Sequence, residues 1–407
     1  MQHVTAGVRQ GILLIAVAWL APIGSTLFAP VLPHMIKHFS YVPHAEVLVP
    51  IALVTPALFV ALLAPFAGIL ADRLGRRRVL LGALTIYAVA GIAPFWLDNL
   101  YLIILSRCIV GIAEAGVMTA STALICDYFH GERRSHWLSI QFGSASLVAT
   151  ACFVLAGILG GYDWRMPFVV YGATAVFIPL VLMCIFEPNA TSPSKEPTRP
   201  STAAAGLLGR RFLGCLALTF LCGLLFYVIP VHISLVLNER GFGDARVLGI
   251  ASAVGSLGVV TGAAVFRVQS RRSVGALLTV AMLAQAVGYA ILYTQHTLYA
   301  GVAGMFINNL GCGMSLPLVL SFTMSRSVDD HRGRASGMWT SVFFIGQFFC
   351  PVSVAAISSA SGGIVGAMAV FAGITAVAGV GFLAGLGSGR FFREPAVVNG
   401  ERVVSVH

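Results

Sequence analysis

The most obvious shortage in this sequence is of charge. Only 10% of its 407 residues are Asp, Glu, Lys or Arg, whereas 58% are hydrophobic. Soluble domains carry roughly 25% charged residues, so a soluble fold is excluded for most of the chain. The excess of apolar side chains has to face lipid, which predicts an integral membrane protein.

Lysine is nearly absent, and motifs of the common enzyme sites are lacking. The two lysines, Lys37 and Lys195, do not end a G-x-x-x-x-G-K-[ST] phosphate loop, which argues against an ATP-driven pump. The sequence has no G-x-S-x-G elbow and no H-E-x-x-H zinc helix. Its eight cysteines lie singly, without a C-x-x-C pair or Cys/His ligand spacing. We therefore expect no enzyme activity, no metal site and no cofactor.

What the chain has in abundance is long apolar runs. A helix needs about 20 apolar residues to cross a bilayer. In the first half such runs lie near 11–33, 46–70, 79–97, 100–125, 137–160 and 165–187. In the second half they lie near 212–236, 246–267, 273–293, 297–322, 334–358 and 363–388. The predicted fold class is an all-α membrane protein with twelve transmembrane helices.

A polar stretch rich in Pro, Ser and Thr separates the two sets of runs. The predicted organisation is an N-terminal six-helix bundle (1–187), a cytoplasmic linker (188–211), a C-terminal six-helix bundle (212–390) and a cytoplasmic tail (391–407).

The distribution of basic residues predicts the orientation. Of the 25 Lys and Arg residues, 20 fall on one side of this topology, 4 on the other and Arg107 within a span. Cytoplasmic loops carry the basic excess, so both termini are expected in the cytoplasm. The same rule explains the net charge of +10 without nucleic-acid binding.

The loop between the second and third runs reads GILADRLGRRRVL over residues 68–80. In this loop Gly68 can permit close helix approach, and Gly75 can supply a tight turn. Asp72 can cap a helix start and accept hydrogen bonds. The alternative is an ordinary positive-inside loop, which would require neither Asp72 nor the glycine spacing.

This run closely resembles the G-x-L-a-D-r-x-G-r-[KR]-x-x-l signature of the major facilitator superfamily. The resemblance implies two pseudo-symmetric six-helix bundles around a central cavity and transport by alternating access. It also implies that this loop is a conformational latch of the outward-facing state. The implied latch residues are Gly68, Asp72, Arg73, Gly75, Arg76, Arg77 and Asp127, the last resembling the family's acidic partner at the end of the fourth span.

A decayed copy of the run lies in the second half, where residues 262–272 read GAAVFRVQSRR. Phe266 replaces the acid and Gln269 the second glycine. We therefore expect the latch chemistry mainly in the first half, and the repeat supports two related bundles.

Two ionisable residues fall deep within the fourth run. Arg107 and Glu114 are seven residues apart, so they share one helix face about 10 Å apart. The run from Arg107 to Gly111 resembles the superfamily's R-x-x-q-G motif, which is linked to proton transfer, although Val110 replaces the glutamine. We predict proton coupling through both residues, because a buried carboxyl can take up and release a proton as access alternates. One alternative is a permanent ion pair, between the two residues or with neighbouring helices, that holds the bundle together. Another is that Arg107 binds an anionic substrate.

Weaker candidates for substrate binding are polar or aromatic residues at plausible cavity depth. Each has an alternative in interhelical hydrogen bonding or packing. Besides Arg107 and Glu114 they are Tyr227, His232, Asn308, Asn309, Phe344 and Gln347.

The predicted function is proton-coupled export of a small organic solute by a monomer in the plasma membrane, or the inner membrane of a Gram-negative bacterium. The expected partners are this substrate, protons and lipid. The alternative is proton-coupled or facilitated uptake of an organic anion or metabolite. Drug:proton antiporters of the superfamily usually carry a Gly-Pro pair in the fifth span, whereas this chain has Gly143-Ser144-Ala145-Ser146-Leu147. This departure weakens the resemblance to the exporter branch and, with Arg107, favours the uptake alternative. An intramembrane enzyme and a passive channel are alternatives from other classes, and no motif favours them.

Overall fold

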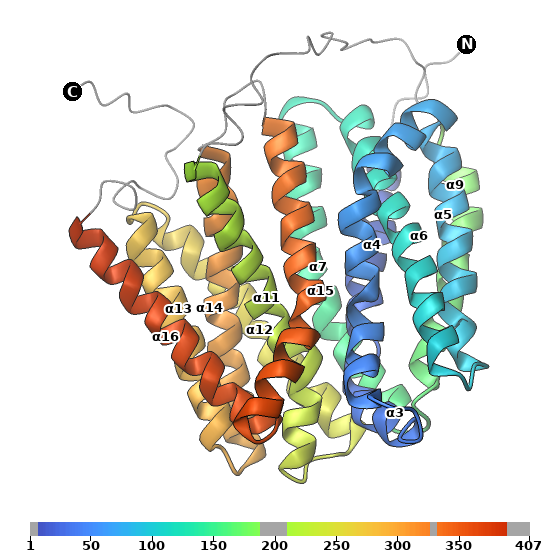
Figure 1. Ribbon diagram of the computed structural model, residues 1–407. Coiled ribbons are helices and arrows are strands. Elements are labelled where there is room, and N and C mark those ends of the chain that lie inside the picture. Colours follow the sequence, from blue (N-terminus) through green and yellow to red (C-terminus); the bar gives the residue numbers. More distant parts are fainter. Residues whose placement is uncertain (1–6, 188–209, 326–331, 389–407) are drawn as a thin grey trace, which may run out of the picture. The chain divides into compact units, whose positions relative to one another are not determined.

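The computed structural model describes residues 7–187, 210–325 and 332–388. Within these ranges the regular elements are helices, and no β-strand is found. Twelve helical segments in the described part of the chain are long and apolar enough to cross a membrane. The predicted all-α, twelve-helix fold is thereby confirmed (Figure 1).

The chain divides into two compact units. Unit 1 comprises Met1–Ala204 together with Asp244–Ile250, and unit 2 comprises Ala205–Gly243 and Ala251–His407. Most of the predicted linker, 188–211, and the whole predicted tail, 391–407, lie outside the described residues. The domain boundaries taken from the sequence stay predictions.

The first and sixth spans of unit 1 are built from short pieces. The first consists of α1 (Val8–Ala18), α2 (Leu20–Thr26), η1 (Ala29–Val31) and α3 (Leu32–His38). The sixth consists of η3 (Met166–Phe168), α8 (Val169–Ala173), η4 (Thr174–Val176) and α9 (Phe177–Cys184). Pro22 and Pro30 lack the backbone N–H that a continuous first helix would use, which favours its interruption.

The other four spans of unit 1 are long helices. They are α4 (Ala45–Leu74), α5 (Arg76–Ile92) continued by η2 (Ala93–Phe95), α6 (Leu100–Tyr128) and α7 (Gly131–Gly160). The side chain of Asn99 starts α6 by accepting hydrogen bonds from the N–H groups of Tyr101 and Leu102. Helix α6 packs against α1, α2, α4, α5 and α7, so it forms the centre of unit 1.

Within its described residues, unit 2 contains five long helices that are wholly its own and most of a sixth, α12. Their bounds are α11 (Arg210–Glu239), α12 (Ala245–Gln269), α13 (Val274–Thr294), α14 (Leu298–Ser325), α15 (Arg332–Ser361) and α16 (Ile364–Ser388). Helix α13 packs between α14 and α16, and α11 packs on α14 and α15 (Figure 1). The fourth helix of each half, α6 or α14, is therefore central in its own unit.

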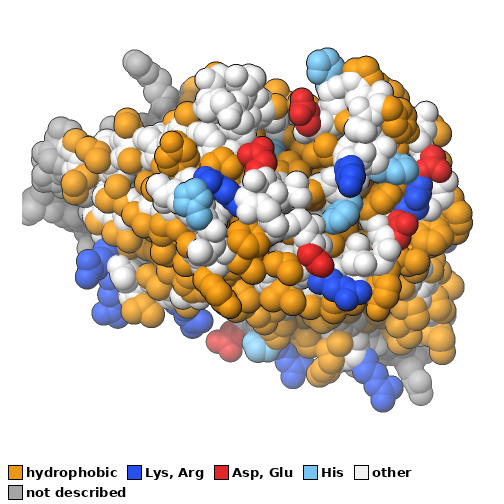
Figure 2. Space-filling model, turned by 90° about the horizontal axis from the view of Figure 1, so that it is seen from below, with side chains coloured by type: hydrophobic (Ala, Val, Ile, Leu, Met, Phe, Trp, Pro, Cys, Tyr) orange, Lys and Arg blue, Asp and Glu red, His pale blue; other side chains and the backbone are white. Residues whose placement is uncertain are grey.

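The end of unit 1 that carries α3 is held together around Asp98. Its carboxylate pairs with Arg165 and lies 3.3 Å from Nε2 of His38, while its backbone oxygen accepts a hydrogen bond from the Tyr41 hydroxyl. These contacts join α3, the loop before α6 and the loop after α7. The molecular face at this end otherwise shows scattered acidic, basic and histidine side chains among apolar ones (Figure 2). The N-terminal end of α6 is thus fixed.

Candidate functional site

The motif loop is a sharp turn between α4 and α5 in unit 1. Gly75 is the one residue between the two helices, with φ 96° and ψ 137°. A side chain is strongly disfavoured at this backbone conformation. The predicted glycine turn at this position is confirmed.

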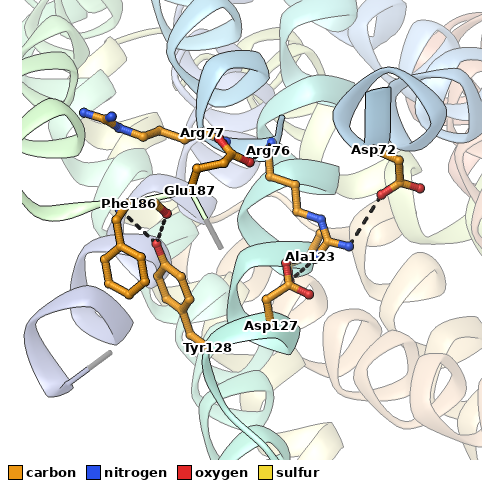
Figure 3. Close-up of polar contacts among 8 residues, drawn as sticks. All are labelled: Asp72, Arg76, Arg77, Ala123, Asp127, Tyr128, Phe186 and Glu187. Carbon is orange, nitrogen blue, oxygen red and sulfur yellow. Dashed lines mark hydrogen bonds and ion pairs between the residues drawn. The ribbon is translucent and has the colours of Figure 1, made fainter. Parts of the chain in front are cut away.

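Asp72 does not cap a helix start, but it accepts a hydrogen bond, as expected, from the guanidinium of Arg76. Asp72 lies in the last turn of α4, where its side chain is 71% exposed and lies 3.5 Å from the guanidinium of Arg76. The start of α5 is instead capped by Glu187, whose carboxylate accepts hydrogen bonds from the N–H groups of Arg76 at 2.6 Å and Arg77 at 3.1 Å (Figure 3). A carboxylate satisfies these free donors and interacts favourably with the positive end of the helix dipole. Sequence reasoning missed Glu187, although a carboxylate just after the sixth span was a visible signal.

Arg76 joins three helices at this loop. Its backbone belongs to α5, and its guanidinium forms an ion pair with Asp127 of α6 and donates to the carbonyl of Ala123 at 3.0 Å (Figure 3). The side chains of Arg76 and Asp127 are 25% and 27% exposed, so this pair is shielded more than a surface pair. The structure brings together the predicted residues Asp72, Arg76 and Asp127 within unit 1.

The end of the sixth span is tied to the same loop. The Arg77 guanidinium donates to the carbonyl of Leu182 at 2.7 Å. The hydroxyl of Tyr128 donates to the carbonyl of Phe186 and accepts from the N–H of the same residue (Figure 3). The loop, the end of α6 and the end of α9 therefore form one hydrogen-bonded cluster, which we call the loop cluster.

Two other motif residues play smaller parts. Arg73 lies in the last turn of α4 with an exposed side chain. Gly68 was expected to permit close helix approach, but a Cβ placed there would meet Cγ2 of Thr119 at an ordinary 3.7 Å. That expectation is wrong for Gly68. Close approach is found instead at Gly262 of the second-half copy, where an added Cβ would collide with the carbonyl oxygen of Leu310.

Arg107 is completely enclosed in unit 1, with 0% exposure. One terminal nitrogen of its guanidinium donates to the carbonyls of Ala90 at 3.2 Å and Gly91 at 2.9 Å. The helical partner of the Ala90 carbonyl would be the N–H of residue 94, which is a proline without one. Proline thus leaves free an acceptor that the guanidinium uses.

Aromatic rings complete the surroundings of Arg107. Its guanidinium carbon lies 6.0, 5.4 and 4.8 Å from the ring centres of Phe28, Phe168 and Tyr171. Cation–π attraction to such rings is strongest where water is excluded. We call these three rings with the two carbonyls the arginine cage. The other terminal nitrogen of Arg107 has no hydrogen-bond partner in the described part of the chain.

Glu114 lies two turns further along α6 and is 5% exposed. A Cβ placed on Gly24 of α2 would lie 3.1 Å from Oε2 of Glu114 and 3.3 Å from the Tyr87 hydroxyl, so both groups border this glycine. Among the described residues Glu114 forms no ion pair with Arg107 and no side-chain hydrogen bond. The alternative of a direct Arg107–Glu114 pair is therefore wrong for this structure.

The second-half candidates lie in unit 2, and all but Phe344 are buried. The side-chain amides of Asn308 and Asn309 donate to the carbonyls of Gln285 and Gly255, as interhelical hydrogen bonding predicts. Nδ1 of His232 and Oε1 of Gln347 lack a partner within the described ranges. The remaining two are aromatic, with Tyr227 packed on Phe226 and Phe344 on Phe343. Their predicted contact with substrate stays a prediction.

Comparisons with known proteins agree with this architecture. A family model described as Major Facilitator Superfamily matches residues 14–327. The chain is 27% identical over 369 residues to the tetracycline resistance protein, class C, of Escherichia coli, covering 86% of this chain and 90% of that protein. It is 26% identical over 388 residues to the bacillibactin exporter of Bacillus subtilis, covering 90% and 94%.

Solved structures show the same fold at low sequence identity. A D-xylose–proton symporter superposes with a TM-score of 0.74 at 12% identity, covering 97% of this chain and 99% of that one. A bacterial homologue of the human lysosomal transporter Spinster gives a TM-score of 0.73 at 15% identity, covering 94% and 97%.

Proposed function

The chain belongs to the Major Facilitator Superfamily, and we propose that it is a proton-coupled exporter of small organic compounds. Membership makes it a multi-pass membrane transporter of small molecules. Export is supported by its relatives, because one of them is named an exporter and another a resistance protein, each matched over most of its length.

The observation that carries proton coupling is the burial of Glu114 in the centre of unit 1. This carboxyl forms neither an ion pair nor a hydrogen bond with the described residues. An ionised carboxylate without a partner is costly in such a place, whereas a protonated one is not. Ionisation of Glu114 therefore requires a change around it, and that requirement can couple proton movement to alternating access.

Arg107 supports this proposal as a fixed positive charge. Its guanidinium is held by two carbonyls and three rings, so it does not depend on Glu114 for its position. It lies near enough to act on Glu114 electrostatically. We assign Arg107 the role of favouring the ionised form of Glu114 once that form arises.

Uptake of an organic anion or metabolite, the alternative function, was favoured by Arg107 as an anion ligand and by the missing Gly-Pro pair of the fifth span. The 0% exposure of Arg107 does not favour that role. The structural resemblance to a D-xylose–proton symporter concerns the fold alone. Export therefore remains our proposal.

For the loop cluster we propose the role of conformational latch. Its ion pairs and hydrogen bonds join the end of α4, the start of α5 and the ends of α6 and α9 into one body. We further propose that this loop and both termini face the cytoplasm, as the distribution of arginine predicts, and that the protein is a monomer in the plasma or inner membrane.

The test is substrate-dependent proton movement in sealed liposomes that contain the purified protein and a pH-sensitive dye. A panel of lipophilic cations, organic anions and neutral metabolites is added, with and without an imposed pH gradient. We expect one compound class to exchange for protons, so that the internal pH changes only when that class is present. Transport without any pH change would instead identify a facilitator.

Two matched variants show whether Glu114 is the coupling group. Glu114→Gln keeps the size and polarity of the side chain but cannot ionise, so proton-driven transport should be lost. Glu46→Gln makes the same chemical change at an exposed residue in the first turn of α4 and should have no effect. Full proton-driven transport by Glu114→Gln would contradict the proposal.

A further inference from the structure

Three hydroxyl groups hold the broken first span of unit 1. Tyr87 of α5 donates to the carbonyl of Leu20 at 2.7 Å, Thr26 to that of Pro22 at 2.7 Å, and Tyr171 of α8 to that of Gly24 at 2.8 Å. Short, interrupted helices of this kind often line the binding sites of secondary transporters. The position of α2 thus depends on side chains from α5 and α8.

Because of these hydrogen bonds, the two tyrosine hydroxyls near Glu114 have no hydrogen left to donate to its carboxyl. A phenol has one hydrogen to donate, and Tyr87 and Tyr171 use theirs on Leu20 and Gly24. The Tyr87 oxygen can still accept a hydrogen bond from a protonated carboxyl. An ionised carboxylate, in contrast, needs a donor, and the hydroxyl of Tyr87 borders the same side of Gly24 as Oε2 of Glu114.

The ionisable neighbours of Glu114 are few. Arg107 lies on the same helix, Tyr87 on α5 and Tyr171 on α8, all within electrostatic range. Cys152 of α7 lies beside the two tyrosines. Ionisable residues on α1 and α4 lie only near their ends, and α2 has none. Two carbonyls and three rings fix the position of Arg107, whereas the Tyr87 hydroxyl shares the border of Gly24 with the Glu114 carboxyl and can turn its hydrogen toward it.

We propose that Tyr87 is a positioning residue through which the protonation state of Glu114 acts on the first membrane span. With Glu114 protonated, the Tyr87 hydrogen stays on the Leu20 carbonyl and α2 is tied to α5. With Glu114 ionised, the phenol turns its hydrogen to the carboxylate, and α2 loses this tie. The inference rests on the proposed function, since it takes Glu114 to be the group that gains and loses the proton.

Unit 2 contains a natural control. Tyr289 of α13 donates to the carbonyl of Leu225 on α11 at 3.0 Å, as Tyr87 of α5 does to the first span of unit 1. Tyr289 packs against Phe371 at 5.7 Å, as Tyr87 packs against Tyr171 at 5.4 Å. The polar group from the fourth helix of this half is the amide of Asn308, and no carboxylate of the described residues acts on Tyr289. Unit 2 therefore has the equivalent tyrosine-to-carbonyl hydrogen bond without a carboxyl whose protonation could alter it.

The test combines two measurements on the full-length protein in lipid nanodiscs at acidic and alkaline pH. Infrared difference spectroscopy follows the protonated-carboxyl band that Glu114→Gln removes. Hydrogen–deuterium exchange follows the backbone of α2, Leu20–Thr26, with rates corrected for the intrinsic effect of pH. In the wild type we expect α2 to exchange about fivefold faster at the alkaline pH, the factor that one hydrogen bond of ordinary net strength contributes.

Tyr87→Phe should make α2 exchange fast at both pH values, while the carboxyl band still titrates. Tyr289→Phe should change neither the titration of the carboxyl band nor the faster exchange of α2 at alkaline pH, which we call the pH step. If Tyr87→Phe speeds exchange equally at both pH values and the step survives, Tyr87 is merely structural and the inference is overturned. A carboxyl band that does not titrate in the wild type would instead overturn the proposed function. Should Tyr87→Phe fail to fold, Glu114→Gln decides, because persistence of the pH step in that variant also overturns the inference.

Discussion

The cap that Glu187 places on α5 can be tested by removing it. In Glu187→Ala the N–H groups of Arg76 and Arg77 lose their acceptor. Loss of a capping side chain costs about 1 kcal/mol, and loss of a negative charge from a helix start about 0.5 kcal/mol more. The first turn of α5 should therefore open about tenfold more often, since about 1.4 kcal/mol corresponds to a factor of ten.

Hydrogen–deuterium exchange of peptides covering the first turn of α5 measures this opening directly. Glu187→Gln keeps an acceptor but not the charge, so its effect should be smaller than that of Glu187→Ala. The matched control is Glu132→Ala, which removes an exposed glutamate from the first turn of α7 that makes no hydrogen bond to the described residues. If Glu187→Ala leaves exchange in α5 unchanged, or Glu132→Ala alters it equally, the capping argument is refuted.

Two pairs of glycine substitutions give further predictions, each measured as a change in thermal unfolding of the purified protein. Gly75→Ala should destabilise by about 1–3 kcal/mol because φ there is 96°, whereas Gly68→Ala in the same motif should be nearly neutral; equal effects would contradict the distinction. Gly91→Ala should cost about 1–3 kcal/mol, because its Cβ would lie 2.5 Å from that of Tyr171. On the same helix, Gly82→Ala meets nothing within 4 Å and should be neutral or stabilising; a loss of stability there would count against the packing described.

Features that depend on local sequence were predictable. Twelve apolar runs of sufficient length gave the twelve spans, because a bilayer imposes that length on every crossing helix. The turn at Gly75 was predictable because its backbone conformation is open to few other residues. The contact between Arg76 and Asp127 was implied by the family resemblance and is present.

Features that depend on distant contacts were not predictable from patterns. Glu187 is 111 residues from Arg76 in sequence, so no local rule assigns it to the start of α5. The same holds for the arginine cage, whose rings come from the first and sixth spans. Spacing along α6 correctly placed Arg107 and Glu114 on the buried side of one helix, but it could not show that the arginine has carbonyl partners of its own. Only the fold of unit 1 distinguishes this arrangement from an ion pair.

The arginine cage also has an electrical consequence. A guanidinium does not lose its proton in proteins, and no carboxylate neutralises Arg107 in the described part of unit 1. The core of that unit therefore carries one positive charge when Glu114 is protonated and none when Glu114 is ionised. Moving one elementary charge across a membrane potential of about 100 mV changes the free energy by about 2.3 kcal/mol. Under the proposed function, the membrane potential therefore acts on the conformational change only when Glu114 is protonated. The change with Glu114 ionised should not depend on the membrane potential.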